Sequence, residues 1–144
     1  MSASDPTIVH SSLDAELVSD LVSKEPALWQ MARILKKDAG TTVTVMSHNR
    51  QSVVVKHRQI DRWRRRADAI MHGSPARRSW LGARLLQTYG FSVPQPLAVV
   101  EKHTACMVKE SLYVSEALPY PPLSTYWREQ SAGWSAQQRR MFLG

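Results

Sequence analysis

Hydrophobic positions near the start of the chain follow a helical spacing. Leu13, Leu17 and Leu21 recur every four residues with acidic residues between them, the pattern of an amphipathic helix. Pro26 then opens a second short apolar segment, as proline often does in the first turn of a helix. The pattern predicts that residues 1–31 form an N-terminal helical segment that lies against the main domain.

Beyond this segment the pattern changes to strands. Residues 41–46 and 52–56 are rich in β-branched side chains and flank a polar turn at 47–50, which predicts a β-hairpin. Residues 34–36 supply a third short strand, joined to the hairpin by a loop that contains Gly40. Three antiparallel strands are expected in this part of the chain.

A helix with clear start and stop signals follows these strands. Ser74 is a typical N-cap, Pro75 fits the first turn and Gly90 fits the position just after the last turn. Residues 97–100 and 112–116 are apolar and β-branched, which predicts two further strands. The expected fold is therefore α+β, with a five-stranded antiparallel sheet and one packed helix.

The end of the chain has the character of a connector. Pro119, Pro121 and Pro122 stiffen it, and residues 135–138 have the spacing of a capping box that opens a helix. That helix would begin only a few residues before Gly144. We therefore expect residues 119–144 to be a hinge connector followed by the beginning of a truncated large lobe.

Positive charge is concentrated in the middle of the chain. The net charge of +7 implies attraction to polyanions such as nucleic acid, anionic lipid or nucleotide phosphates. Much of the excess lies between Lys56 and Arg78. The run from Arg62 to Arg66 could bind nucleic acid through phosphate contacts and stacking on Trp63, but such a run is more often a solvated helix face. Nucleic acid is therefore an unfavoured partner.

Several classes of protein are disfavoured by what the sequence lacks. No apolar run reaches the roughly 18 residues of a membrane-spanning helix, and the N-terminus has no secretory signal, so a cytoplasmic location is expected. The single cysteine, Cys106, cannot form an internal disulfide and fits a reducing compartment. The five histidines lack the tight pair spacings of zinc ligands, so we expect no metal site.

Two motifs carry a resemblance to kinases. Residues 53–56 read V-V-V-K and look like the V-A-I-K lysine strand of protein kinases. Residues 90–98 read G-F-S-V-P-Q-P-L-A, with R-S-W at 78–80 before them. This passage is similar to the G-I-P-T-P-R-P-L-A passage of lipopolysaccharide kinases of the Kdo/WaaP type. The resemblance implies that residues 32–118 form a protein-kinase-like small lobe.

The resemblance also implies that the chain contacts ATP at three places. The loop at Gly40 and Thr41 would cover the phosphates, and Lys56 would contact them. The hinge that meets adenine would be the backbone of Glu116, Ala117 and Leu118. In the complete protein, phosphate would pass from ATP to lipopolysaccharide or another lipid-linked sugar acceptor at the inner face of the inner membrane. Peripheral contact with anionic lipid would suit the basic charge.

The sequence departs from the kinase pattern in three respects. Gly40 stands alone where protein kinases carry G-x-G-x-x-G. Residues 75–89 contain no acidic residue, and Ser79 stands where the helix glutamate is expected. Either Asp68 or the missing large lobe would have to pair with Lys56, or the protein is an impaired member of the family. The chain has neither an H-R-D-x-x-x-x-N loop nor D-F-G, so no catalytic residue is expected in it, and Mg²⁺ is expected only with the missing large lobe.

Two other functions fit the same sequence. The chain could be a stand-alone binding or regulatory module built on a small lobe. It could also be a basic nucleic-acid-binding domain that uses the run from Arg62 to Arg66. On the kinase interpretation, the chain alone binds ATP and is inactive in phosphoryl transfer.

Overall fold

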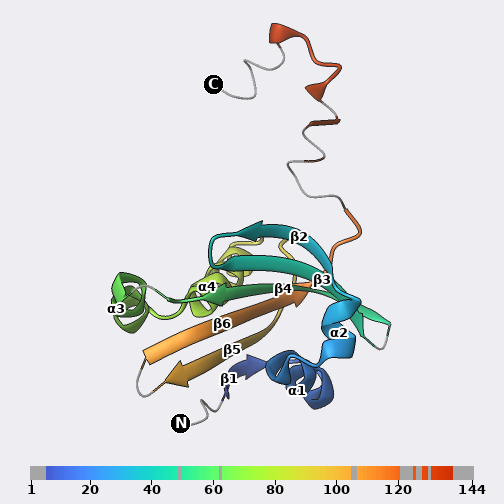
Figure 1. Ribbon diagram of the computed structural model, residues 1–144. Coiled ribbons are helices and arrows are strands. Elements are labelled where there is room, and N and C mark those ends of the chain that lie inside the picture. The colour runs from blue at the N-terminus through green and yellow to red at the C-terminus, as the bar shows by residue number, and fades with distance from the viewer. Residues whose placement is uncertain are drawn as a thin grey trace.

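The fold is α+β, with the strands of an open antiparallel sheet arranged in the order β1-β5-β6-β4-β3-β2 (Figure 1). It is seen in a computed structural model that describes residues 6–48, 50–61, 63–104, 107–120, 125, 128–129 and 131–137. The strands are β1 (Pro6–Ser11), β2 (Arg33–Asp38), β3 (Thr41–His48), β4 (Gln51–Gln59), β5 (Pro96–Thr104) and β6 (Met107–Glu116). The helices are α1 (Ala15–Ser23), α2 (Pro26–Gln30), α3 (Trp63–His72) and α4 (Pro75–Thr88).

The five strands predicted from the sequence are confirmed. β2, β3 and β4 form two successive hairpins, and Thr44 pairs with Val55 in the second. β5 and β6 form a third hairpin, and β6 lies beside β4. The sheet therefore pairs β4, which precedes α3 and α4 in the sequence, with β6, which follows them.

A sixth strand is the main difference from the predicted fold. β1 pairs with β5, so that Ile8 lies opposite Val100 at the edge of the sheet. The prediction that residues 1–31 are helical is wrong for residues 6–11, and the predicted sheet of five strands is one strand short. Thr7, Ile8 and Val9 are β-branched, a short run that fits a strand once an edge partner is available.

One face of the sheet carries the hydrophobic core. The predicted N-terminal helices α1 and α2 are confirmed and cover this face, where their apolar side chains join those of β3 to β6. Alternate strand residues supply the sheet side of the core, because successive side chains point to opposite faces. The buried members are Leu17, Val18, Leu21, Leu28, Met46, Val53, Val55, Leu97, Ala98, Val100, Leu112 and Val114.

The other face is covered by α4, which packs on β4, β5 and β6. Ser74 caps α4 and Gly90 follows its last turn with a φ of +81°, so both predicted signals are confirmed. α3, which was not predicted as a separate element, precedes α4 and packs on β6. Gly73, with a φ of +78°, makes the bend between the two helices.

Some sequence predictions cannot be compared with the structure. The continuation of a C-terminal helix beyond residue 137, Cys106, and the side chains of residues 62–65 lie outside the described residues. Among the residues that are described, no helix is both long enough and apolar enough to cross a membrane.

Candidate functional site

A groove of about 1050 Å³ lies at the end of the sheet where β2 begins and β6 ends. Val45 on β3, Val54 on β4 and Ser115 on β6 form part of it, and the register places these three side by side on the α4 face. Leu35 on β2 adds an apolar wall. The predicted hinge residues also line the groove, and these are Glu116, Ala117 and Leu118.

The hinge is tied to the sheet at its first two residues. The amide of Glu116 donates to the carbonyl of Gln95 at 2.9 Å, and the amide of Ala117 donates to the carbonyl of Ser52 at 3.0 Å. The next amide, that of Leu118, donates to no acceptor within the described part of the chain. The groove is therefore bordered by a fixed strand end and one available backbone donor.

Lys56 lies on the same face of β4 as Val54, two residues and about 7 Å further along the strand. It is half-buried and lines a tight crevice beneath α4, together with Ser79 and Tyr113. Its ammonium group makes no hydrogen bond or ion pair with any described residue. Ser79, the residue at the expected glutamate position, therefore does lie near Lys56, but it leaves the lysine charge unpaired.

Two further groups give this crevice its polarity. The hydroxyl of Ser111 is buried there without a hydrogen-bond partner in the described residues. Burial raises the pKa of Tyr113, whose strand position lies opposite Lys56, so its phenol is neutral at physiological pH. The crevice is thus lined by two cationic side chains, Lys56 and Arg58, and by neutral polar groups rather than by a carboxylate.

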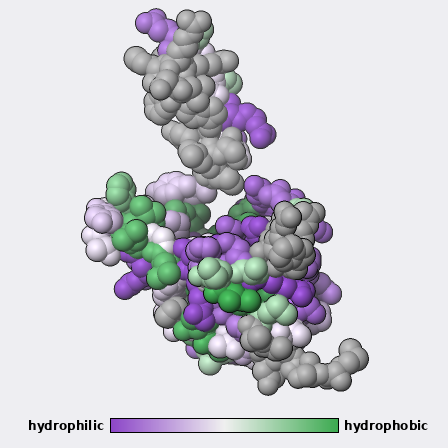
Figure 2. Space-filling model, turned by 90° about the vertical axis from the view of Figure 1, so that its left-hand side faces the viewer, coloured by the Kyte–Doolittle hydropathy of each residue, from purple (hydrophilic) through white to green (hydrophobic). Residues whose placement is uncertain are grey.

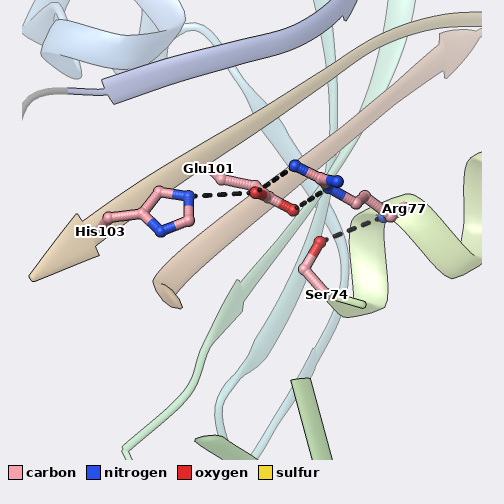
Figure 3. Close-up of polar contacts among 4 residues, drawn as sticks. All are labelled: Ser74, Arg77, Glu101 and His103. Atoms are coloured by element: carbon pink, nitrogen blue, oxygen red, sulfur yellow. Dashed lines mark hydrogen bonds and ion pairs between the residues drawn. The ribbon is translucent and has the colours of Figure 1, made fainter. Parts of the chain in front are cut away.

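The buried carboxylate beneath α4 belongs to Glu101 on β5, and it binds an arginine (Figure 3). The Nε and Nη2 atoms of Arg77 donate to Oε1 and Oε2 of Glu101 at 2.8 and 3.1 Å. Nε2 of His103 lies 3.1 Å from Oε2 on the other side. Only 1% of the Glu101 side chain is exposed, so this contact fixes the first turn of α4 to the sheet.

The ionisation of Glu101 depends on these contacts. Burial alone would raise the pKa of the carboxyl, but hydrogen bonds from Ser74, Arg77 and His103 hold the pKa below its ordinary value. In protein kinases the helix supplies the acid and the strand supplies the base. Here the two residue types are exchanged between helix and strand. The helix α4 supplies the basic residue, Arg77, and the strand β5 supplies the acidic residue, Glu101.

Asp68, the other acid considered as a partner for Lys56, is engaged elsewhere. Its carboxylate accepts from Nη1 of Arg78 at 2.7 Å and lies 3.2 Å from Nδ1 of His72. The hydrogen bond from Arg78 lowers the pKa of Asp68. This carboxylate joins α3 to α4 at the surface and does not reach the lysine.

The loop at Gly40 is a tight turn between β2 and β3. Gly40 has a φ of +79°, a conformation that favours glycine, and its carbonyl accepts from the amide of Gln59 at 2.9 Å. Thr41 already belongs to β3, opposite Arg58. Neither Gly40 nor Thr41 lines the groove or the crevice. The turn lies beside the C-terminal end of β4, so Lys56 is between the turn and the groove along this strand.

A second, partly buried polar cluster lies at the edge of the core face and was not predicted. Nε2 of His57 is 3.0 Å from Oε2 of Glu110, and Nζ of Lys24 is 3.1 Å from the same oxygen. Burial lowers the pKa of His57 despite the hydrogen bond to Glu110. The cluster ties the end of α1 to the sheet. Because its members are far apart in the sequence, no spacing pattern predicts it.

Comparisons with known proteins add nothing to this geometry, because no family model, curated protein or solved structure matches the chain. Among the described residues, no group of three His, Cys, Asp or Glu side chains is placed to hold a metal ion. A functional hypothesis therefore depends on the groove, the crevice and the sheet that positions them.

Proposed function

We propose that this chain is the ATP-binding small lobe of a phosphotransferase that resembles lipopolysaccharide kinases. The observation that carries the proposal is the groove lined by both Val54 and the hinge residues 116–118. Lys56 lies two residues from Val54 on the same face of β4. Along β4, an apolar surface that could hold a base thus lies next to a cation that could contact phosphates.

The order of the strands supports this proposal. β2, β3 and β4 are consecutive neighbours, the chain then forms α3 and α4, and β6 returns beside β4 with β5 outside it. Strand, strand, lysine strand, helix, strand, strand is the element order of a protein-kinase small lobe. β1 adds a further edge strand to that arrangement.

The groove could receive adenine through packing and one backbone hydrogen bond. Val45 and Val54 offer an apolar floor for the base, and the amide of Leu118, which donates to no described acceptor, offers a donor at its edge. A triphosphate extended along β4 would then come within reach of the ammonium of Lys56, which has no partner among the described residues. The chain's own contribution on this proposal is binding and orientation of the nucleotide.

Phosphoryl transfer belongs to the complete protein in this proposal. The sequence has no catalytic aspartate loop and no D-F-G magnesium motif, so the acceptor, a lipopolysaccharide or lipid-linked sugar, would be served only together with a large lobe. The reversed Arg77 and Glu101 pair fixes α4 without the lysine. Lys56 would therefore be positioned by packing in the crevice, and the complete protein would act in the cytoplasm at the inner face of the inner membrane.

Isothermal titration calorimetry of the purified chain with ATP tests the proposal. Lys56→Ala should weaken ATP binding at least tenfold, because it removes the cation expected to meet the phosphates. Lys109→Ala is the matched control, since Lys109 is an exposed lysine on β6 that lines neither the groove nor the crevice. Val54→Trp should also weaken binding, by filling the groove, and magnesium should change the affinity little.

Two outcomes would contradict the proposal. Undetectable ATP binding at high protein concentration would remove the nucleotide function, and equal effects of Lys56→Ala and Lys109→Ala would remove the assigned site. A short DNA duplex provides the competing ligand. Salt-sensitive DNA binding without ATP binding would favour the nucleic-acid function of the run from Arg62 to Arg66.

A further inference from the structure

The outer side of α4 carries an exposed apolar stripe. Leu81, Leu85 and Tyr89 follow one another at helical spacing and are 65%, 57% and 72% exposed. The inner side of the same helix is buried against the sheet at Ala76, which is 3% exposed. No described residue covers the stripe. We call Leu81, Leu85 and Tyr89, together with Phe91 just beyond the helix, the α4 stripe.

Positive charge is concentrated in the segment of the sequence that contains this stripe. Residues 62–91 contain seven arginines and one aspartate, so they hold +6 of the net charge of +7. On α4 itself, Arg77 and Arg78 are paired with Glu101 and Asp68. Arg84 lies beside the stripe, is exposed, and has no ion pair among the described residues. Figure 2, which views the molecule from the α3 side, shows hydrophobic and hydrophilic surface closely interspersed.

We infer that the α4 stripe and the neighbouring Arg84 form a docking face for an anionic lipid bilayer. Exposed leucines and aromatic residues beside arginine are the composition of helices that lie in the interface of a membrane, where the apolar groups enter the acyl boundary and the cations meet headgroup phosphates. An uncovered stripe of this kind is unfavourable in water. The exposed Arg84 beside the stripe, together with the net charge of +6 on residues 62–91, favours an anionic surface.

This docking face is separate from the proposed nucleotide site. None of Leu81, Leu85, Tyr89 or Arg84 lines the groove or the crevice. The inference therefore stands or falls without ATP binding. If both hold, α4 would lie between the lipid surface and the sheet, with the groove at one end of that sheet.

Co-sedimentation with vesicles tests the inference. The purified chain should bind vesicles of phosphatidylcholine with about 30% phosphatidylglycerol, and should bind pure phosphatidylcholine vesicles at least tenfold more weakly at low salt. Leu81→Ser combined with Leu85→Ser should weaken binding to the anionic vesicles by about tenfold or more, because two apolar anchors are lost. Arg84→Glu should weaken binding by roughly tenfold.

Matched variants at other exposed sites test whether vesicle binding depends on the stripe itself or on any exposed apolar or charged residue. Ile8→Ser combined with Met31→Ser removes two apolar residues that are 55% and 75% exposed and lie outside the stripe. Lys37→Glu reverses an exposed charge on β2. Both controls should bind vesicles much like the parent chain, and circular dichroism should show that every variant is folded.

The inference is overturned if the stripe variants and the control variants lose the same affinity, or if anionic and neutral vesicles bind alike. Size-exclusion chromatography at the assay concentration tests a different occupant. A dimer that dissociates on Leu81→Ser and Leu85→Ser, with no vesicle binding by the parent chain, would assign the stripe to a second copy of the chain instead.

Discussion

The two faces of the sheet are built from the same strands but have opposite character. On β4 and β6, Val55 and Leu112 point into a sealed core beneath α1 and α2. The alternate residues Lys56 and Tyr113 point to the face covered by α4, beside a polar crevice and an open groove. Residues that adjoin in sequence therefore have different surroundings, since strand side chains alternate.

This difference separates the face that stabilises the fold from the face that holds the proposed nucleotide site. The core face is filled by aliphatic side chains whose burial stabilises the fold. The α4 face contains a lysine without a partner among the described residues and a buried ion pair, features that add little net stability. Substitutions on the two faces should therefore have different signatures, and four predictions test this from the largest expected effect to the smallest.

Leu112→Ala should give the largest loss of stability, about 2–5 kcal/mol, because it leaves a cavity in the core. Leu112 is only 1% exposed. Urea denaturation followed by circular dichroism measures the loss. Val54→Ala, on the opposite face of the sheet, is the matched control. The expected difference between the faces is absent if Val54→Ala lowers the free energy of unfolding as much as Leu112→Ala does.

Glu101→Gln should destabilise the fold by about 1–3 kcal/mol at neutral pH, because it weakens a buried, charge-assisted contact with Arg77. The folded-state pKa of Glu101 lies below 4.5, so its contribution is present above pH 4.5 and is lost as the pH falls through the folded-state pKa. Urea denaturation at a series of pH values should show the parent and variant converging in acid. A constant difference would show that the charge is not the cause.

His57→Gln should flatten the pH dependence of stability just below neutrality. Burial holds the folded-state pKa of His57 below 6.5, so the unfolded chain binds more protons there and the parent chain loses stability as the pH falls from 6.5. Glutamine keeps a hydrogen-bonding group near Glu110 but does not titrate. Melting temperatures measured between pH 7 and pH 5 should fall less for the variant, whereas equal slopes would exclude His57 as the source.

Lys56→Met should change stability least, by about 0.5 kcal/mol or less, because the ammonium has no partner among the described residues. The same variant should lose most of the ATP affinity of the parent chain. Thermal unfolding and calorimetry on one preparation compare the two effects. A large loss of stability together with unchanged ATP binding would assign Lys56 to the scaffold instead.

Local signals were sufficient to predict much of the fold. The β-branched runs identified β3 to β6, residues 34–36 before Gly40 indicated β2, and Ser74, Pro75 and Gly90 marked the ends of α4. These signals act within a few residues and need no distant partner. α3 was missed as an element because an arginine-rich stretch provides little apolar periodicity, although the bend at Gly73 separates it from α4.

Contacts between distant residues could not be predicted in the same way. Arg77 meets Glu101 only because α4 lies across β5, and the two side chains share no spacing pattern in the sequence. Strand pairing brings Val45, Val54 and the predicted hinge together in the groove. Of these parts, the sequence indicated only the hinge. Whether these residues bind a nucleotide stays a prediction, and Gly40 and Thr41 lie outside the groove.

The pairing of β1 with β5 also constrains the order in which the molecule can be completed during synthesis. Ile8 pairs with Val100, so β1 must wait for about 90 further residues to be synthesised before its partner strand exists. At 5–20 residues per second this delay is on the order of ten seconds. Until then the pairing at this edge of the sheet cannot form, and β1, although it is synthesised before β5, is among the last strands to reach its final neighbour.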